Sequence, residues 1–371
     1  MKKKAMSHLI PLISILLLIW TAESMAAPTA SEWQRGGTDA YPLNIDLIAN
    51  PQPAASNSST LANYLYSHTG GAAGHYTVNA KDWTYAWYWT EDATTLTCAT
   101  TGGQYNLPQI PWNPAWKVPG GTDAQVIITD RTTGKEIMLY GASVVSTNPC
   151  KVSASVLNFV GQDTTYGNDT PADYRLKDNN WKPAWSPGIP YTKRVTTRAE
   201  LERGAVDHAM SMPSNLEASS WVAPAMQSDG PATNGSTYPI PAGTRFQLNP
   251  ANWSDASCNT WANGKNVNAA LKDIAAKLCK GLLHYGAYIS DRSGVSHIQL
   301  EADASANWNT YCVNGACASA SGMANLLDGL IRSANDWVAI VPSDKYVLPS
   351  GIQNPSPTLA PPNPPSGLSV N

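Results

Sequence analysis

Charged residues are scarce in this 371-residue sequence. Asp, Glu, Lys and Arg make up 14% of the chain, whereas about 25% is usual. The formal net charge is −3, and the only run of basic residues stands at positions 2–4. Such a surface is poorly suited to neutralise a phosphate backbone, so we expect no nucleic-acid partner.

Phenylalanine is almost absent, with two residues against 14 Trp and 16 Tyr. Trp and Tyr combine a flat apolar face with a polar group, so they suit wet ligand-binding surfaces, whereas Phe serves equally well in a dry core. The bias favours stacking against sugar rings. The alternative is that it reflects the composition of an exported β-protein and nothing more.

Long apolar runs are also missing. The longest, residues 9–20, is too short to span a bilayer and contains Pro11 and Ser14. Lysines precede it and small residues at 24–27 follow it, which is the pattern of a secretory signal peptide. We predict that residues 1–27 are removed and that the mature chain is extracellular or periplasmic, with no membrane span. An uncleaved anchor is the alternative.

Local catalytic signatures are absent as well. The sequence has no Gly-x-Ser-x-Gly, no His-Glu-x-x-His, no phosphate-binding loop and no dinucleotide fingerprint. We predict neither a cofactor nor a metal ion. A catalytic site would have to be assembled from residues distant in sequence.

Cysteines are present in an even number, which in an exported chain favours disulfides over metal ligands. Six residues allow fifteen pairings. Proximity in sequence favours Cys98–Cys150, Cys258–Cys279 and Cys312–Cys317.

The domain organisation follows from composition and periodicity. We predict an N-terminal arm at 28–59, a single β-rich domain at 60–346 and a Pro-rich tail at 347–371. Hairpins are predicted for 125–130 with 135–145 and for 287–291 with 296–301. Further strands are predicted at 43–48, 83–89, 203–212, 243–248 and 337–341. The fold class expected is mainly β: a secreted, jelly-roll-like β-sandwich with one or two docked helices, the alternative being α+β.

Helical signals are few. Residues 61–67 fit a short helical turn, and residues 196–204 carry a Thr cap, a Glu three residues after Thr197 and a terminal Gly. Residues 266–283 have apolar side chains at helical spacing, and 323–331 also reads as helical.

Aromatic residues gather in two places. The run 83–89 would place its tryptophans on one face of a strand, as either a core wall or a sugar platform. A long aromatic loop covers 161–191, and loops of that length are typically functional or mobile. The predicted substrate-binding residues are Trp87, Trp89, Trp181, Trp185 and Tyr191.

Three motifs occur in a fixed order at 204–209 (GAVDHA), 241–248 (PAGTRFQL) and 285–291 (YGAYISD). With 121–123 and 130–136 upstream, this order resembles a family of secreted bacterial proteins of unestablished activity. The resemblance implies a shared β-sandwich with polar residues at matching places. The last eight residues resemble the start of a fibronectin type III module, whose usual neighbours in secreted bacterial proteins are polysaccharide-degrading domains.

Candidate chemistry must come from separate strands. A base such as His208 with the cation Arg245 suits a polysaccharide lyase, whereas Asp291 with Glu301 suits a glycoside hydrolase, which needs two carboxyl groups about 5–9 Å apart. The structural alternatives are that His208 is a buried core residue and that Arg245 forms an ion pair with Asp291 between neighbouring strands. The predicted catalytic residues are His208, Arg245, Asp291 and Glu301, with Asp123 and Glu136 in reserve.

The function expected is that of a secreted carbohydrate-active protein whose partner is an extracellular polysaccharide or other glycan. It would act as a lyase or a hydrolase. The alternatives are a non-catalytic carbohydrate-binding or surface-interaction protein and a structural envelope protein.

Overall fold

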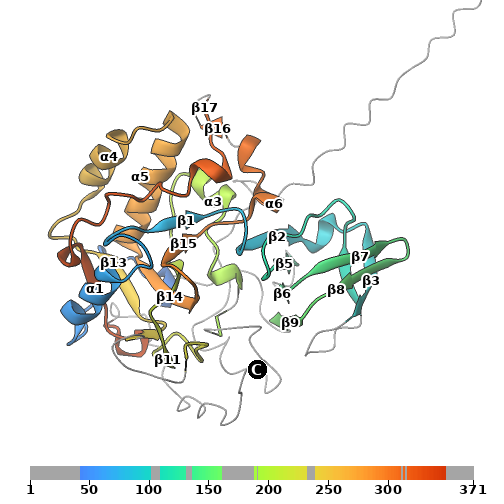
Figure 1. The fold of residues 1–371 in the computed structure, drawn as a ribbon, viewed down its shortest axis with the longest axis horizontal. Coiled ribbons are helices and arrows are strands. Elements are labelled where there is room, and N and C mark those ends of the chain that lie inside the picture. The colour runs from blue at the N-terminus through green and yellow to red at the C-terminus, as the bar shows by residue number, and fades with distance from the viewer. Residues whose placement is uncertain are drawn as a thin grey trace, which may run out of the picture.

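The computed structural model describes residues 42–101, 109–130, 136–160, 188–189, 191–231, 239–310, 312–313 and 316–347. The predicted signal peptide, the first part of the arm, most of the aromatic loop and nearly all of the Pro-rich tail lie outside these ranges. Two regions are visible in Figure 1, a sheet sandwich and a larger region that combines strands with helices.

The sandwich consists of two four-stranded sheets. The first has the order β2 (Tyr85–Trp89), β5 (Gln125–Thr129), β6 (Glu136–Tyr140) and β9 (Val156–Val160). The second has the order β4 (Gln109–Trp112), β3 (Thr95–Thr101), β8 (Cys150–Ser153) and β7 (Ser143–Thr147). Side chains from both sheets, among them Tyr88, Val126, Ile110 and Val152, share one buried cluster. The predicted β5–β6 pairing is confirmed as antiparallel, with Ile127 opposite Met138.

The larger region is built on a sheet with the order β10 (Met210–Ser214), β14 (Ala287–Arg292), β13 (Arg245–Leu248) and β18 (Trp337–Ala339). Its helices are α1 (Ser58–Ser67), α3 (Arg198–Arg203), α4 (Asp255–Asn263), α5 (Ala269–His284) and α6 (Asp303–Ala306). Three further strand pairs are β1 (Thr77–Asn79) with β15 (His297–Gln299), β11 (Glu217–Trp221) with β12 (Ile240–Ala242), and β16 (Cys312–Val313) with β17 (Ala316–Cys317).

Helix α5 forms where its apolar spacing predicts a helix. The Asn268 side chain caps its start by accepting a hydrogen bond from the Leu271 N–H. Its buried face joins the largest hydrophobic cluster, together with β10, β13 and β14. Gly281 permits a close approach, because a Cβ there would lie 2.8 Å from Val206. The caps predicted for α3 are also present, with a Thr197–Glu200 capping box and Gly204 in the left-handed conformation.

Three local predictions are wrong. Strands β14 and β15 do not form a hairpin, because β14 lies between β10 and β13 while β15 pairs with β1. Residues 43–48 form a 3₁₀ turn and loop instead of a strand. Residues 323–331 form successive turns instead of a helix. Alternation and helical spacing describe which side chains are buried, and a packed loop can bury the same side chains without regular structure.

The fold is therefore rich in sheet with few helices, which is consistent with the mainly β or the α+β prediction. A jelly roll is not confirmed. The pairs β2–β5, β3–β8 and β10–β14 are parallel, whereas a jelly roll is built from antiparallel strands.

The disulfides Cys98–Cys150 and Cys258–Cys279 are present as predicted. The first joins β3 to β8 inside the sandwich, and the second joins α4 to α5. The backbone places Cys312 directly opposite Cys317 in the β16–β17 ladder, and their pairing remains a prediction. Within the described residues, no helix has the length and hydrophobicity needed to cross a bilayer.

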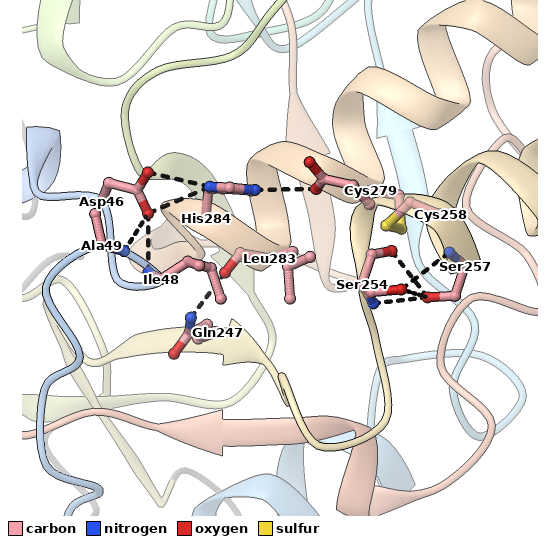
Figure 2. Close-up of polar contacts among 11 residues, drawn as sticks. Asp46, Ile48, Ala49, Gln247, Ser254, Ser257, Cys258, Cys279, Leu283 and His284 are labelled. Carbon is pink, nitrogen blue, oxygen red and sulfur yellow. Dashed lines mark hydrogen bonds and ion pairs between the residues drawn. A yellow bond between two sulfur atoms is a disulfide. The ribbon is translucent and has the colours of Figure 1, made fainter.

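The described part of the N-terminal arm is held by His284 at the end of α5 (Figure 2). The His284 Nδ1 lies 3.1 Å from an oxygen of Asp46, and its Nε2 lies 3.0 Å from Asp255 at the start of α4. Burial lowers the pKa of His284, but the hydrogen bonds and charges of both carboxylates raise it more, so the net pKa lies above its ordinary value.

We expect the His284 contacts to weaken as the pH rises. A raised folded-state pKa means that the stabilisation is fully present below the unfolded value of about 6.5 and disappears as the pH rises through the folded value. The variant His284→Gln should lose on the order of 1 kcal/mol at low pH and little at high pH. Urea unfolding across the pH range measures this, with the exposed His68→Gln as control. An equal loss at every pH would contradict it.

Candidate functional site

His208 lies in the loop between α3 and β10, with its side chain buried. Its Nε2 is 3.2 Å from Glu200 Oε2, and its Nδ1 is 2.9 Å from the Ala209 carbonyl oxygen. Burial lowers the pKa of His208, but the charge and hydrogen bond of Glu200 raise it more, so the net pKa is raised. Both ring nitrogens thus contact oxygens inside the protein, which favours the core-histidine interpretation.

Arg245 is equally committed to internal contacts. Its guanidinium donates to the carbonyl oxygens of Tyr285 at 2.6 Å, Pro42 at 2.7 Å and Ile45 at 2.8 Å, and to the Tyr346 hydroxyl at 3.2 Å. The residue is 2% exposed. The expected ion pair with Asp291 is not formed, since Asp291 contacts Arg194 instead. Arg245 thus fixes the N-terminal arm to the central sheet.

Glu301 and Glu136 are buried carboxylates that join chain segments. Glu301 accepts hydrogen bonds from the Arg198 N–H at 3.1 Å and the Ser305 hydroxyl at 2.7 Å. Glu136 accepts the Tyr191 N–H at 2.7 Å. Burial raises the pKa of each to about 7. His208, Arg245, Asp291 and Glu301 share no hydrogen-bond partner among the described residues, and each makes its own internal contacts.

The predicted aromatic platform is a core wall where the structure describes it. Trp87, Trp89 and Tyr191 are each 1% exposed and pack in one cluster with Ile127 and Met138. A sugar ring cannot stack on side chains that the protein covers. Trp181 and Trp185 lie outside the described residues.

Two of the candidate residues, Asp123 and Asp291, line a cleft of about 650 Å³. Its walls come from β1 and the segment 81–83, from residues 122–123 before β5, from the end of β14 and from β15. The cleft thus lies where the sandwich meets the larger region, near the β1–β15 pair in Figure 1. Its polar and charged lining includes Lys81, Asp82, Arg292 and His297.

Trp83 is the unusual residue of this cleft. It is 51% exposed, whereas every other tryptophan among the described residues is buried or half-buried. Its φ of +52° is an outlier for a bulky residue. Its carbonyl accepts hydrogen bonds from the Asn79 and Gln299 side chains, both at 3.3 Å. A Cβ on Gly121 would lie 2.7 Å from the indole nitrogen, so one ring face rests on that glycine.

Asp291 lies at the cleft wall within a group of carboxylates. Oxygens of Asp291, Asp229 and Glu217 lie within 4.8 Å of one another. The Arg292 N–H reaches Asp291 at 2.9 Å and Asp229 at 3.2 Å, and Arg194 donates to Asp291 at 3.2 Å. Burial raises the pKa of Asp291 most, and the charges of Asp229 and Glu217 raise it further. Arg194 lowers it, but the net pKa is well above its ordinary value. Carboxylate oxygens are Ca²⁺ ligands, but here Arg194 already supplies a positive charge.

His297 lines the same cleft and is 6% exposed. Its Nδ1 donates to the Val295 carbonyl at 3.1 Å, which leaves Nε2 as a lone-pair acceptor. Nothing among the described residues hydrogen-bonds to that Nε2. Burial lowers the pKa of His297 to about 4, so the ring is neutral near pH 7.

No known family model, curated protein or solved structure matches this chain. The function must therefore be argued from the cleft itself.

Sequence reasoning missed the members of this site that lie outside regular strands. Trp83 stands just before β2, and its positive φ turns it away from the face that Tyr85, Trp87 and Trp89 share. Nothing in the local sequence signals that conformation. Arg194 and Asp229 are isolated charges in loops, whose meeting at Asp291 depends on tertiary structure alone.

Proposed function

We propose that this chain is a secreted carbohydrate-active protein that binds an extracellular glycan in the Trp83 cleft. The exposed, strained Trp83 carries the proposal. A left-handed backbone for a non-glycine residue costs on the order of 1–3 kcal/mol, and such strain persists at functional sites where the surroundings hold it. The protein here uses two side-chain hydrogen bonds to the Trp83 carbonyl and the bare backbone of Gly121.

The cleft lining suits a sugar better than a purely apolar ligand. An indole with one covered face presents the other as a flat apolar surface, to which the C–H face of a pyranose is complementary. Around it, Lys81 and Arg292 offer donors, Asp82 and Asp123 offer acceptors, and His297 Nε2 offers a neutral acceptor. Apolar lining with a few convergent polar groups is typical of small-ligand sites.

Other features support the same proposal. The signal-like leader and the disulfides are compatible with export. The fibronectin-like end of the sequence supports polysaccharide-rich surroundings. An elimination reaction based on His208 and Arg245 is not carried forward, because both side chains are occupied inside the protein.

Replacing Trp83 with glycine is expected to abolish binding without loss of stability. Glycine adopts a positive φ at no steric cost, so Trp83→Gly removes the platform and relieves the strain together. Binding to xylan, β-glucan, pectin and alginate oligosaccharides on an array, followed by calorimetry on those that bind, should show at least a tenfold loss. Trp83→Tyr should retain part of the affinity.

The exposed Val145→Ala on β7 serves as the control and should bind as the wild type does. Unchanged binding by Trp83→Gly would show that the glycan lies elsewhere. Absence of binding to every polysaccharide by the wild type would refute the proposed function.

A further inference from the structure

Two carboxyl groups from different parts of the fold line the cleft that holds Trp83. Asp123 precedes β5 of the sandwich, and Asp291 lies in β14 of the larger region. The Tyr140 hydroxyl donates to Asp123 at 3.1 Å, and the Arg292 N–H donates to Asp291 at 2.9 Å. Both carboxyl groups are thus held in place before a ligand arrives.

Their surroundings differ in a way that separates an acid from a base. Asp291 is 7% exposed and lies against Asp229 and Glu217. Like charges this close disfavour ionisation of all three groups, which favours the protonated form of Asp291. This crowding and burial raise the pKa of Asp291 well above its ordinary value. Asp123, in contrast, is partly exposed and accepts a neutral hydroxyl.

The charged and titratable groups facing Asp291 come from several elements. Arg194 is fully buried, and its guanidinium also donates to the Ser290 carbonyl at 2.8 Å. Once Asp291 has lost its proton, this guanidinium stabilises the carboxylate that remains. Among the described residues, the charged and titratable groups near Asp291 include Arg194, Arg292, Glu217, Asp229, Asp123, Tyr85, Tyr140, Tyr191 and Tyr288.

We propose that the Trp83 cleft hydrolyses glycosidic bonds, with Asp291 as the proton donor to the leaving oxygen and Asp123 as the carboxylate that activates water. The proposal rests on the glycan binding proposed above. Two observations besides the carboxylates point to a ligand here: the exposed Trp83 and the buried His297 Nε2, which no described residue contacts by a hydrogen bond.

The reaction balances with water as the second reactant. The Asp291 proton passes to the glycosidic oxygen as the bond from that oxygen to the anomeric carbon breaks. A water oxygen bonds to the anomeric carbon, and the water proton passes to Asp123. Proton exchange with solvent water then returns a proton to Asp291 and removes one from Asp123. Each turnover therefore consumes one water and yields two shorter glycans, one with a new reducing end.

The test measures reducing ends released from the oligosaccharides that bind on the array. Asp291→Asn and Asp123→Asn should each lower kcat by at least a hundredfold, the lower range for general acid or base catalysis, while calorimetric affinity stays within a few fold. Asp344→Asn, a partly exposed carboxylate outside the cleft lining, should be unchanged. Thermal unfolding of each variant checks that it is folded. Because Asp123 is partly exposed, Asp123→Asn still tests the proposal if Asp291→Asn fails to fold.

Substitution of Asp229 tests the role of Asp291 through the pH profile of activity, which would not shift if Asp291 only stabilised the fold. Removing its charge in Asp229→Asn lowers the pKa of Asp291, so the alkaline limb of the pH profile should shift to lower pH. Wild-type binding without release of reducing ends would overturn hydrolysis and leave the glycan-binding proposal standing. Unsaturated products, or full activity in Asp291→Asn, would also overturn this assignment.

Discussion

Replacing Arg245 with methionine is expected to destabilise the protein by at least about 3 kcal/mol. Methionine keeps the apolar stem but removes every donor. Three backbone carbonyls, those of Tyr285, Pro42 and Ile45, then lose a charged hydrogen bond in a buried site, and each such bond contributes about 1.5–3 kcal/mol. Arg245→Lys should lose less, although an ammonium cannot reproduce the planar fork that reaches three carbonyls.

The effect should be local as well as global. Pro42 and Ile45 belong to the N-terminal arm, so limited proteolysis of Arg245→Met should first cut near residues 42–50. Urea unfolding gives the free energy, and N-terminal sequencing gives the cut site. Arg203→Met is the matched control, because Arg203 makes a surface i,i+4 pair with Asp207 and should change stability by less than about 1 kcal/mol. Equal stability of Arg245→Met and the wild type would mean that the arm docks without Arg245.

The motifs that stand out in the sequence turn out to build the central sheet. The segment at 241–248 contains most of β12 and all of β13, the segment at 285–291 contains most of β14, and the segment at 204–209 leads into β10. Their polar residues, His208 and Arg245, carry charge into the interior to bind backbone and loop groups. A polar residue within an apolar pattern therefore indicates a buried contact, and the pattern alone does not tell a structural contact from a catalytic one.

Local signals gave the right answer where local chemistry decides structure. The Thr197 cap, the apolar spacing of α5 and the β5–β6 turn residues act within a few positions of one another. The 287–301 hairpin failed because β15 pairs with β1, more than two hundred residues earlier in the chain. The turn residues between β14 and β15 do not determine this pairing, because tertiary packing selects the strand that β15 joins.

The candidate site was only partly predictable, because local signals place some of its residues and tertiary contacts place the others. Asp123 and Asp291 could be named because each stands beside a strand that the sequence reveals. Trp83 could not be singled out from its neighbours, because alternation assigns it the same face as Trp87 and Trp89. Its positive φ, and the packing of its ring on Gly121, arise from contacts between separate segments.

Removing the Glu200 carboxylate should be the second severe change. Glu200 is fully buried and accepts hydrogen bonds from the Asp207 N–H at 3.1 Å and His208 Nε2 at 3.2 Å. It also completes the capping box of α3 with Thr197. Glu200→Ala would remove the partner that raises the pKa of His208, so the buried ring would either lose its proton or carry a charge without a counter-charge. Breaking a buried pair from one side costs about 3–5 kcal/mol.

The pair should also give stability a pH dependence of known sign. The pKa of His208 is raised in the folded state, since the Glu200 charge and hydrogen bond outweigh the lowering effect of burial. Stabilisation from this ionisation is thus complete below the unfolded pKa of about 6.5 and is lost as the pH rises through the folded pKa. The ionisable groups that face the ring are Glu200 and Asp207.

His208→Gln separates charge from hydrogen bonding at this position. The glutamine amide can still donate to Glu200, so the variant should lose about 1–3 kcal/mol near pH 6 and much less above the folded pKa of His208. Urea unfolding of both single variants and of Glu200→Ala/His208→Gln completes a double-mutant cycle. We expect the double variant to be more stable than the sum of the single losses predicts, because it no longer contains the buried ring that Glu200→Ala deprives of its partner. Strict additivity, or a loss independent of pH, would show that His208 and Glu200 do not act as an ion pair, and it would return His208 to the list of residues available for chemistry.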